Sequence, residues 1–209
     1  MAEREEPEGS GQWPIRDLTD PFAMRALAHP LRLRLLELLQ LRGPLTATQC
    51  GDALGETPAN CSFHLRTLAK YGYVEEAEGG TGRQRPWRAA MEGRRWRAGP
   101  SAPQETRAAA DQLERVMAER NIKRLYHYLD HADDYGPEWS EAAMVGDMAT
   151  YMTPAELDAV SQQLLAVIRP YLNRLRDPAE RPEGSRPVWF FAAGFPIEPP
   201  GREERPGDA

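Results

Sequence analysis

Residues 45–71, LTATQCGDALGETPANCSFHLRTLAKY, contain the signals of two short helices joined by a tight turn. The first helix is expected to begin after Thr46, because Gln49 stands three residues later and the two residues can cap each other's free backbone N–H groups. Gly55 is expected to end it, since glycine readily adopts the left-handed conformation common at helix C-termini. Thr57-Pro58 then supplies an N-cap and a proline at the first helical position. The stretch therefore predicts two helices held at a steep angle by a short turn.

The spacing of apolar residues in the second helix indicates which of its faces is free. Cys61, Leu65 and Leu68 recur at steps of four and three and form the stripe expected to pack inward. The outward set begins with small or hydrogen-bonding side chains and includes two cations: Ala59, Asn60, Ser62, Phe63, Arg66 and Lys70. This surface suits a helix-turn-helix whose second helix reads base edges and contacts phosphates. The alternative is a helix pair inside an ordinary helical domain.

The charge distribution also favours a DNA-binding segment. The whole chain has a net charge of −6, but residues 21–98 contain 12 Lys and Arg against 7 Asp and Glu, and the remainder contains 14 against 25. One segment is therefore basic and its flanks are acidic. Such asymmetry is a better indication of a nucleic-acid partner than the total charge.

Length, cysteine content and hydropathy limit the remaining possibilities. A chain of 209 residues holds one large domain or two small ones, and its two cysteines do not form a secreted disulfide framework. No apolar run approaches the roughly 18 residues that cross a membrane, and the first residues do not resemble a signal peptide. The expected location is the cytoplasm.

A hairpin is expected after the second helix of the pair. Residues 73–76 alternate in polarity, 78–82 contain three glycines, and 83–88 return with several cations. Arg83 and Arg85 are placed as wing residues that contact phosphates or a minor groove, and a charged edge that prevents aggregation is the alternative. Upstream, Asp20-Pro21 opens a short helix, and a leucine-rich helix follows between Pro30 and Gly43.

Three runs in this segment resemble the ArsR-type winged helix-turn-helix transcriptional regulators of bacteria: ALAHPLRLRLL at 26–36, ALG at 53–55 and SFHLRTL at 62–68. The resemblance covers about residues 20–90. It implies a homodimer that binds an inverted-repeat operator in double-stranded DNA. The residues placed on DNA by their position are Thr48, Gln49, Thr57, Pro58, Ala59, Asn60, Ser62, Phe63, Arg66, Lys70, Arg83 and Arg85. Phe63 stands where the family usually has a polar or basic residue.

Metal binding is a separate possibility, because the same family includes metal sensors. Their paired-cysteine motif would fall near residues 46–48, where this chain has no thiol. Cys50 and Cys61 are interpreted as small core residues, and His64 as support for helix packing. His127 and His131 share a helix face near Asp130 and Asp134, which leaves open a metal sensor or a metal-dependent enzyme. The chain has no nucleophile elbow, phosphate loop or HExxH motif, so neither an enzyme nor a cofactor is expected.

The second half of the chain predicts a dimerisation region. An uninterrupted helical pattern extends from Thr106 to about Ala132, longer than a small winged domain needs for its own core. Its apolar stripe is therefore expected to pack on a second copy through Leu113, Val116, Met117, Ile122, Leu125 and Leu129. Packing within the chain is the alternative.

Beyond that helix, the pattern predicts a strand over 142–152, a helix beginning at Thr153-Pro154 that Pro170 kinks or splits, and a buried strand over 188–195. This unit is expected to enclose a pocket for a hydrophobic effector, lined by Trp139, Met148, Tyr151, Trp189, Phe191 and Phe195. Plain core is the alternative interpretation for these aromatic positions.

The sequence thus predicts a mainly α fold with small β structure. A disordered tail covers 1–18, a winged helix-turn-helix domain 19–98, a long helix with a C-terminal α/β region 103–200, and a second tail 201–209. The expected function is sequence-specific transcriptional regulation. A protein-interaction module that kept the winged fold without binding DNA is the remaining alternative.

Overall fold

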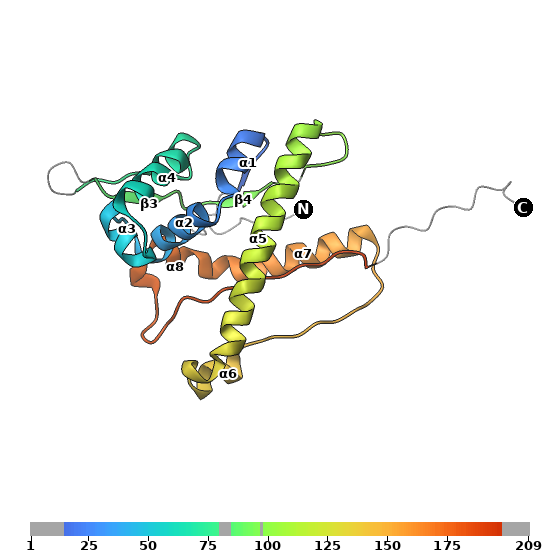
Figure 1. Ribbon diagram of the computed structural model, residues 1–209. Helices are drawn as coiled ribbons and strands as arrows, with labels where there is room; N and C mark the ends of the chain where they lie inside the picture. Colours follow the sequence, from blue (N-terminus) through green and yellow to red (C-terminus); the bar gives the residue numbers. More distant parts are fainter. Residues whose placement is uncertain (1–14, 80–84, 97, 198–209) are drawn as a thin grey trace, which may run out of the picture.

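The computed structural model describes residues 15–79, 85–96 and 98–197 (Figure 1). Its first half contains four helices in the order expected for a helix-turn-helix domain, with the central leucine-rich helix surrounded by the others. Leu35, Leu39, Leu65 and Leu68 are fully buried at the centre of this domain. The four helices are α1 (Pro21–Leu27), α2 (Pro30–Arg42), α3 (Ala47–Leu54) and α4 (Pro58–Lys70).

Side-chain caps begin the helices at the positions that the sequence predicts. Thr46 and Gln49 form a reciprocal capping box at the start of α3, and the Thr57 hydroxyl accepts a hydrogen bond of 3.2 Å from the Asn60 N–H at the start of α4. Gly55 ends α3 in the left-handed conformation, with φ of 69°. Replacing an N-cap of this kind by alanine typically costs about 0.5–2 kcal/mol. The two helices are therefore fixed largely by local sequence.

A short antiparallel hairpin follows α4. It pairs β2 (Val74–Glu76) with β3 (Trp87–Ala89), in a register that places Val74 opposite Ala89, and Trp87 also bridges to Leu45 ahead of α3. Its tip, residues 80–84, lies outside the described residues. The hairpin confirms the predicted wing and completes a winged helix-turn-helix.

The N-terminal segment differs from the expected tail where it is described. Residues 15–17 form β1 (Ile15–Asp17), which pairs in parallel with β4 (Gly93–Arg95), and the next residue, Leu18, is buried. Arg95 donates two hydrogen bonds to the Asp17 carboxylate, at 2.6 and 2.9 Å. The tail prediction is wrong for 15–18 because a partner strand distant in sequence orders these residues. Residues 1–14 and 198–209, which include the second predicted tail, lie outside the described residues.

The long helix α5 (Gln104–Asp130) has the predicted length of 27 residues. Its first half packs against α1, with Leu113 fully buried and Arg25 paired to Glu105 at 2.7 Å. Its second half extends beyond the winged domain (Figure 1). One helix therefore joins the winged domain to the rest of the chain.

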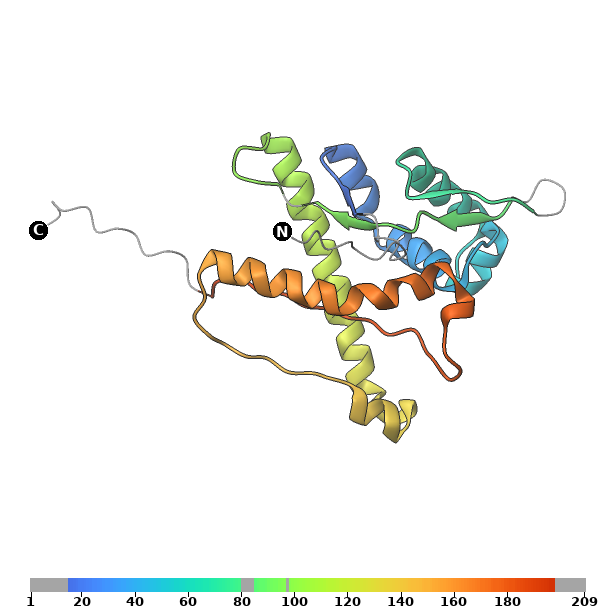
Figure 2. The same cartoon turned by 180° about the vertical axis from the view of Figure 1, so that it is seen from behind.

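The C-terminal half is helical but forms no core of its own, because none of residues 132–197 is buried. As predicted, Thr153 caps a helix, and the α-helix ends at Ile168, ahead of Pro170. Figures 1 and 2 show the row of elements from α7 to α8 crossing α5 on the side away from α4. The elements are η1 (Ala132–Tyr135), α6 (Pro137–Ala142), α7 (Pro154–Ile168), η2 (Arg169–Leu172), α8 (Asn173–Arg176) and η3 (Pro178–Glu180).

The strands expected over 142–152 and 188–195 are not formed in the single chain. Residues 143–153 and 186–196 belong to no helix or strand. A strand needs a hydrogen-bonding neighbour, and neither segment has one within 15–79, 85–96 and 98–197. The mainly α fold with few strands is confirmed, whereas the α/β character expected for 103–200 is wrong among the residues that the structure describes there.

None of the helices within the described ranges is both long and apolar enough to cross a membrane.

Candidate nucleic-acid interface

The outer face of α4 is open to solvent. Cys61, Leu65 and Leu68 point inward with no exposed surface, as predicted, while Phe63 on the opposite side is 60% exposed. The second half of the chain does not cover this face, since α4 packs on the other helices of the winged domain and on β2 (Figures 1 and 2). The exposed α4 positions and its N-cap are Thr57, Pro58, Ala59, Phe63, Arg66 and Lys70, and Asn60 and Ser62 are half-buried.

Several predicted contact residues also hold the helix ends in place. The Asn60 side-chain amide donates a 2.9 Å hydrogen bond to the Glu56 carboxylate, and the Gln49 side chain accepts from the Thr46 N–H at 2.8 Å. The Asn60 carbonyl oxygen and its second amide hydrogen have no partner among the described residues. Asn60 can therefore keep its structural bond and still present a donor and an acceptor outward.

The cations at the end of α4 differ in how they are held. Among the described residues Arg66 makes no hydrogen bond or ion pair, whereas the Lys70 ammonium lies 5.4 Å from the centre of the Tyr71 ring. A free guanidinium on an exposed helix face presents two parallel donors that match guanine or phosphate oxygens. Arg66 is the side chain on this face best suited to an acidic partner.

The cations of the wing are paired with glutamates. Arg85 lies 3.0 Å from Glu76, and Arg88 lies 2.8 Å from Glu75, across the β2–β3 ladder. Arg83 lies outside the described residues. Both ion pairs are exposed and thus contribute little to stability, so a phosphate can compete for the guanidinium groups. The sequence reasoning missed this pairing, although the glutamates of β2 were the available signal.

Two histidine rings pack together between α4 and the start of α2. His64 is buried, its ring centre lies 4.6 Å from that of His29 at the start of α2, and the Phe63 ring packs edge-on against it at 5.2 Å. Burial lowers the pKa of both imidazoles, and the neighbouring Arg32 cation lowers them further. Two neutral rings therefore hold the two helices together, as expected for a packing histidine.

The two cysteines are buried free thiols, Cys50 on α3 and Cys61 on α4. Burial raises the pKa of Cys50 to about 11 and raises that of Cys61 as well. A thiol with a raised pKa is a poor nucleophile and a poor metal ligand at neutral pH, because both roles require the thiolate. The positions agree with the predicted core role.

The metal alternative receives no support from the residues that are described. His127 and His131 do lie together, with ring centres 4.4 Å apart, but His131 Nδ1 is 2.8 Å from the His127 carbonyl oxygen. No three His, Cys, Asp or Glu side chains within 15–79, 85–96 and 98–197 converge as a metal-binding group.

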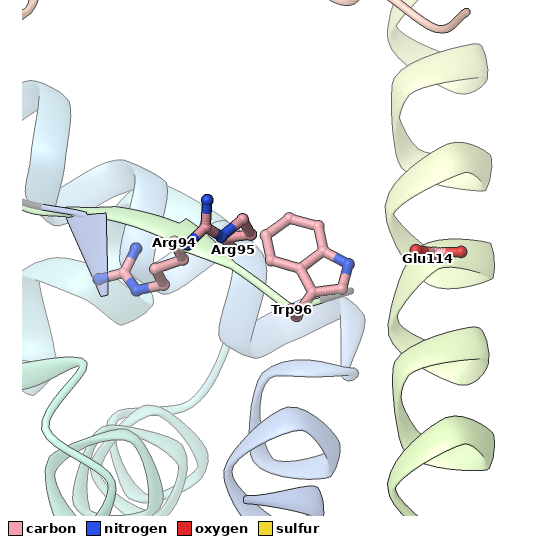
Figure 3. A pocket seen from close by; sticks show the side chains of 4 residues that line it. All are labelled: Arg94, Arg95, Trp96 and Glu114. Carbon is pink, nitrogen blue, oxygen red and sulfur yellow. The ribbon is translucent and has the colours of Figure 1, made fainter. Parts of the chain in front are cut away.

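Two cavities lie away from α4. One, of about 250 Å³, lies between β4 and α5. Trp96 turns there toward the helix that carries Glu114 (Figure 3). The arginines of this cavity are engaged: Arg95 holds Asp17, and the Arg94 guanidinium lies 5.2 Å from the centre of the Tyr73 ring. The second, of about 360 Å³, lies where α8 meets α2 and β3, and Arg42, Arg88, Arg176 and Arg181 contribute to its lining.

The six residues assigned to an effector pocket do not line either cavity. Met148 is 94% exposed and Tyr151 fully exposed, so neither faces an enclosed space in the single chain. Trp139 lies against Arg186, and Phe195 is mostly exposed. The side chains are dispersed because the strands expected to bring them together are not formed. The single chain therefore gives the effector-pocket prediction no support.

The six residues assigned to dimerisation divide into two groups along α5. Leu113 is fully buried in its own chain, and Val116 and Met117 pack on the same core. Leu113 is thus unavailable to a second subunit, because its surface is already covered by the winged domain. Ile122, Leu125 and Leu129 are exposed on the half of α5 that extends beyond it.

A family model described as a helix-turn-helix domain matches residues 27–76, the segment from the end of α1 to β2. The chain contains a helix-turn-helix domain. The winged helix-turn-helix architecture expected from the resemblance to ArsR-type regulators is confirmed, in the order of the helices and in the wing, and the family match covers its helix-turn-helix part. Helix-turn-helix domains of this type bind DNA in transcriptional regulators. No curated protein matches the chain.

Solved structures similar to the chain each cover a little less than half of it. Reduced HlyU from Vibrio cholerae N16961 is 20% identical over 46% of this chain and 84% of its own, with a TM-score of 0.29. The homodimeric winged helix-turn-helix DNA-binding domain of Mb0332 from Mycobacterium bovis, a possible ArsR-family transcriptional regulator, is 23% identical over 49% and 81%, with a TM-score of 0.31. A transcriptional regulator homologue from Pyrococcus horikoshii OT3 is 21% identical over 48% and 88%, with a TM-score of 0.29.

Proposed function

We propose that this protein is a sequence-specific transcriptional regulator that binds an inverted-repeat operator as a homodimer. The observation that carries the proposal is the open face of α4 in a helix-turn-helix domain. Thr57 caps the N-terminus of α4, and Arg66 further along has no partner among the residues that the structure describes. This helix is the element that such domains place in the major groove. Thr48, Gln49 and the residues of α4 are the proposed DNA contacts, and Arg83 and Arg85 of the wing are proposed to contact phosphates.

Homodimerisation is proposed to use the half of α5 beyond the winged domain. Ile122, Leu125 and Leu129 are exposed there at steps of three and four, so they lie along one side of the helix. An apolar stripe on a helix that extends beyond its own domain is suited to packing against the same helix of a second subunit. In this division of the chain, residues 19–98 bind DNA and residues 103–200 assemble the dimer.

Binding-site selection from random duplex DNA tests the proposal. The full chain is expected to enrich an imperfect inverted repeat whose half-sites are centred about 34 Å apart, or a multiple of this distance, because a two-fold dimer places its two α4 helices on one side of the duplex. Footprinting should then protect both half-sites. Enrichment of no sequence, with binding that disappears at high salt, would instead favour an interaction module or a non-specific binder.

The dimer is tested separately by sedimentation of the full chain. Leu125→Asp places a charge in the proposed stripe and is expected to raise the dimer dissociation constant at least tenfold, whereas Leu113→Met, in the chain's own core, should leave the dimer intact. An unchanged dissociation constant for Leu125→Asp would reject this use of α5.

The proposed function is not enzymatic. A hydrophobic effector is not part of it either, because the side chains expected to bind one are exposed or dispersed in the single chain.

A further inference from the structure

Two extended segments of the C-terminal half have no backbone partner within the described residues. Residues 144–152 and 187–197 make no backbone hydrogen bond to any other described residue. All their residues are exposed, so water can hydrate these N–H and C=O groups in the single chain, and a neighbouring strand can replace that water. The second segment, PVWFFAAGFPI, contains no charged residue and is rich in residues that favour strands.

The second segment is nevertheless held in place along one side. The Trp189 ring lies under the guanidinium groups of Arg120 and Arg124 of α5, at 4.7 and 4.2 Å from its centre. Further on, a Cβ added to Gly194 would stand 3.0 Å from Leu157 Cδ1 of α7. Figures 1 and 2 show the segment running beside α7 and across α5. It is therefore an extended segment held along one side, without a neighbouring strand among the described residues.

Many large apolar side chains of residues 144–197 are exposed in the single chain. Those of α7 and of residues 188–195 lie on segments that run side by side, whereas residues 144–152 form a separate arch (Figures 1 and 2). The exposed residues are Met144, Val145, Met148, Tyr151, Met152, Val160, Leu164, Leu165, Val167, Tyr171, Val188, Trp189, Phe190, Phe191, Phe195 and Ile197.

We infer that residues 188–195 form an interchain β-strand that pairs antiparallel with the same segment of a second copy. The inference rests on the homodimer of the proposed function and adds the strand that joins its subunits. A second copy is the occupant because the segment stacks on Arg120 and Arg124, next to the α5 stripe proposed to contact the twin. A two-fold axis across the segment brings two identical strands together antiparallel, so the pair satisfies both backbones at once. The uncharged surface also offers nothing to a partner selected by charge.

Hydrogen exchange of the full chain tests the pairing. The amides of residues 188–195 are expected to exchange slowly at concentrations where the chain is dimeric and to lose protection on dilution to monomer. Fast exchange of these amides in a chain that sedimentation shows to be dimeric would overturn the inference and leave the proposed function standing. A chain that stays monomeric on its operator would overturn both.

Proline substitution separates backbone pairing from side-chain burial. Successive N–H groups in a strand point to opposite edges, so one of Phe190→Pro and Phe191→Pro removes a donor from the paired edge. That variant is expected to raise the dimer dissociation constant at least tenfold over the alanine variant of the same residue. Equal effects of proline and alanine at both positions would overturn the inference. The fold is checked on each variant by the circular dichroism of its helices.

Discussion

Arg124 of α5 donates hydrogen bonds to both carboxylate oxygens of Glu37 on α2, at 2.6 and 2.8 Å, and the same guanidinium lies over Trp189. Three segments distant in the sequence meet at this one side chain: the central helix of the winged domain, the long helix and the extended C-terminal segment. Arg120 reinforces the contact at 3.8 Å from Glu37. The long helix is thus attached to the winged domain beyond the point where its apolar stripe leaves the core.

Replacing Arg124 by glutamine is expected to destabilise the chain. The substitution removes two charge-assisted hydrogen bonds from a half-buried carboxylate, and bonds to charged groups typically contribute about 1.5–3 kcal/mol. Urea unfolding followed by circular dichroism measures the loss. Arg115→Gln, on an exposed position of the same helix, is the matched control and should stay within about 0.5 kcal/mol of the parent. Equal stabilities of the two variants would show that the Glu37 contact is energetically unimportant.

Arg66→Ala is expected to weaken binding to the selected operator by about 1–3 kcal/mol and to relax the sequence preference at one base pair, if Arg66 contacts a guanine edge. Fluorescence anisotropy with the operator and with single-base variants gives both quantities. Arg115→Ala removes the same charge from α5, far from α4, and should change affinity little. A similar loss for both variants would indicate a general charge effect rather than base recognition.

The wing pairs predict opposite effects for the two partners of one ion pair. Arg85→Ala should reduce the slope of log affinity against log salt by about one unit, because one phosphate contact is lost, and it should weaken all sequences alike. Glu76→Gln frees the Arg85 guanidinium from its 3.0 Å partner and removes a negative charge, so it should strengthen binding. Salt titrations of the two variants beside the parent measure both slopes. If Arg85→Ala leaves the slope unchanged, the wing does not contact the backbone.

Tyr73 predicts a stability change at alkaline pH. Its buried hydroxyl donates a 2.8 Å hydrogen bond to the Ala23 carbonyl, and burial raises its pKa to about 12, against the lowering effect of Arg94 and Arg16. The folded chain holds this proton more tightly than the unfolded one. The contribution of the protonated Tyr73 hydroxyl to the free energy of unfolding is therefore complete below pH 10 and is lost as pH rises toward 12. At pH 11 the loss is about 1 kcal/mol.

Tyr73→Phe is the control for that pH dependence. It should be less stable than the parent at pH 8 by about 1–3 kcal/mol, because the Ala23 carbonyl loses its donor. The difference between the two chains should shrink by about 1 kcal/mol at pH 11, since only the parent loses stability through this group. Urea unfolding at both pH values gives the comparison. If the stability difference between Tyr73→Phe and the parent is the same at pH 8 and pH 11, Tyr73 does not ionise between these pH values.

Elements specified by neighbouring residues could be predicted from the sequence. The Thr46 capping box, the Thr57-Pro58 start of α4 and the inward stripe at Cys61 and Leu65 each depend on residues within one or two helical turns. These local signals determine where α3 and α4 begin and which face of α4 is exposed. The predicted face of α4 is correspondingly free, although its contacts with DNA stay a prediction.

Elements that depend on a distant partner could not be predicted in the same way. β1 is short and polar at Arg16 and Asp17, and only its pairing with β4 makes it a strand. The apolar residues 188–195 have strand composition but lack a neighbour, so composition alone predicted a sheet that one chain does not form. The ion pair of Arg85 with Glu76 likewise requires the register of the hairpin.

The length of α5 has a mechanical consequence. At 1.5 Å for each residue the helix is about 40 Å long, with α1 packed on its first half and the proposed contacts with the twin on its last. A tilt of about 5° at one end displaces the other by about 3 Å, close to the rise of one base pair. Small rearrangements among the C-terminal segments would therefore shift the two α4 helices of the dimer by about one base pair along the duplex. A shift of this size is enough to bring the helices into or out of register with their half-sites.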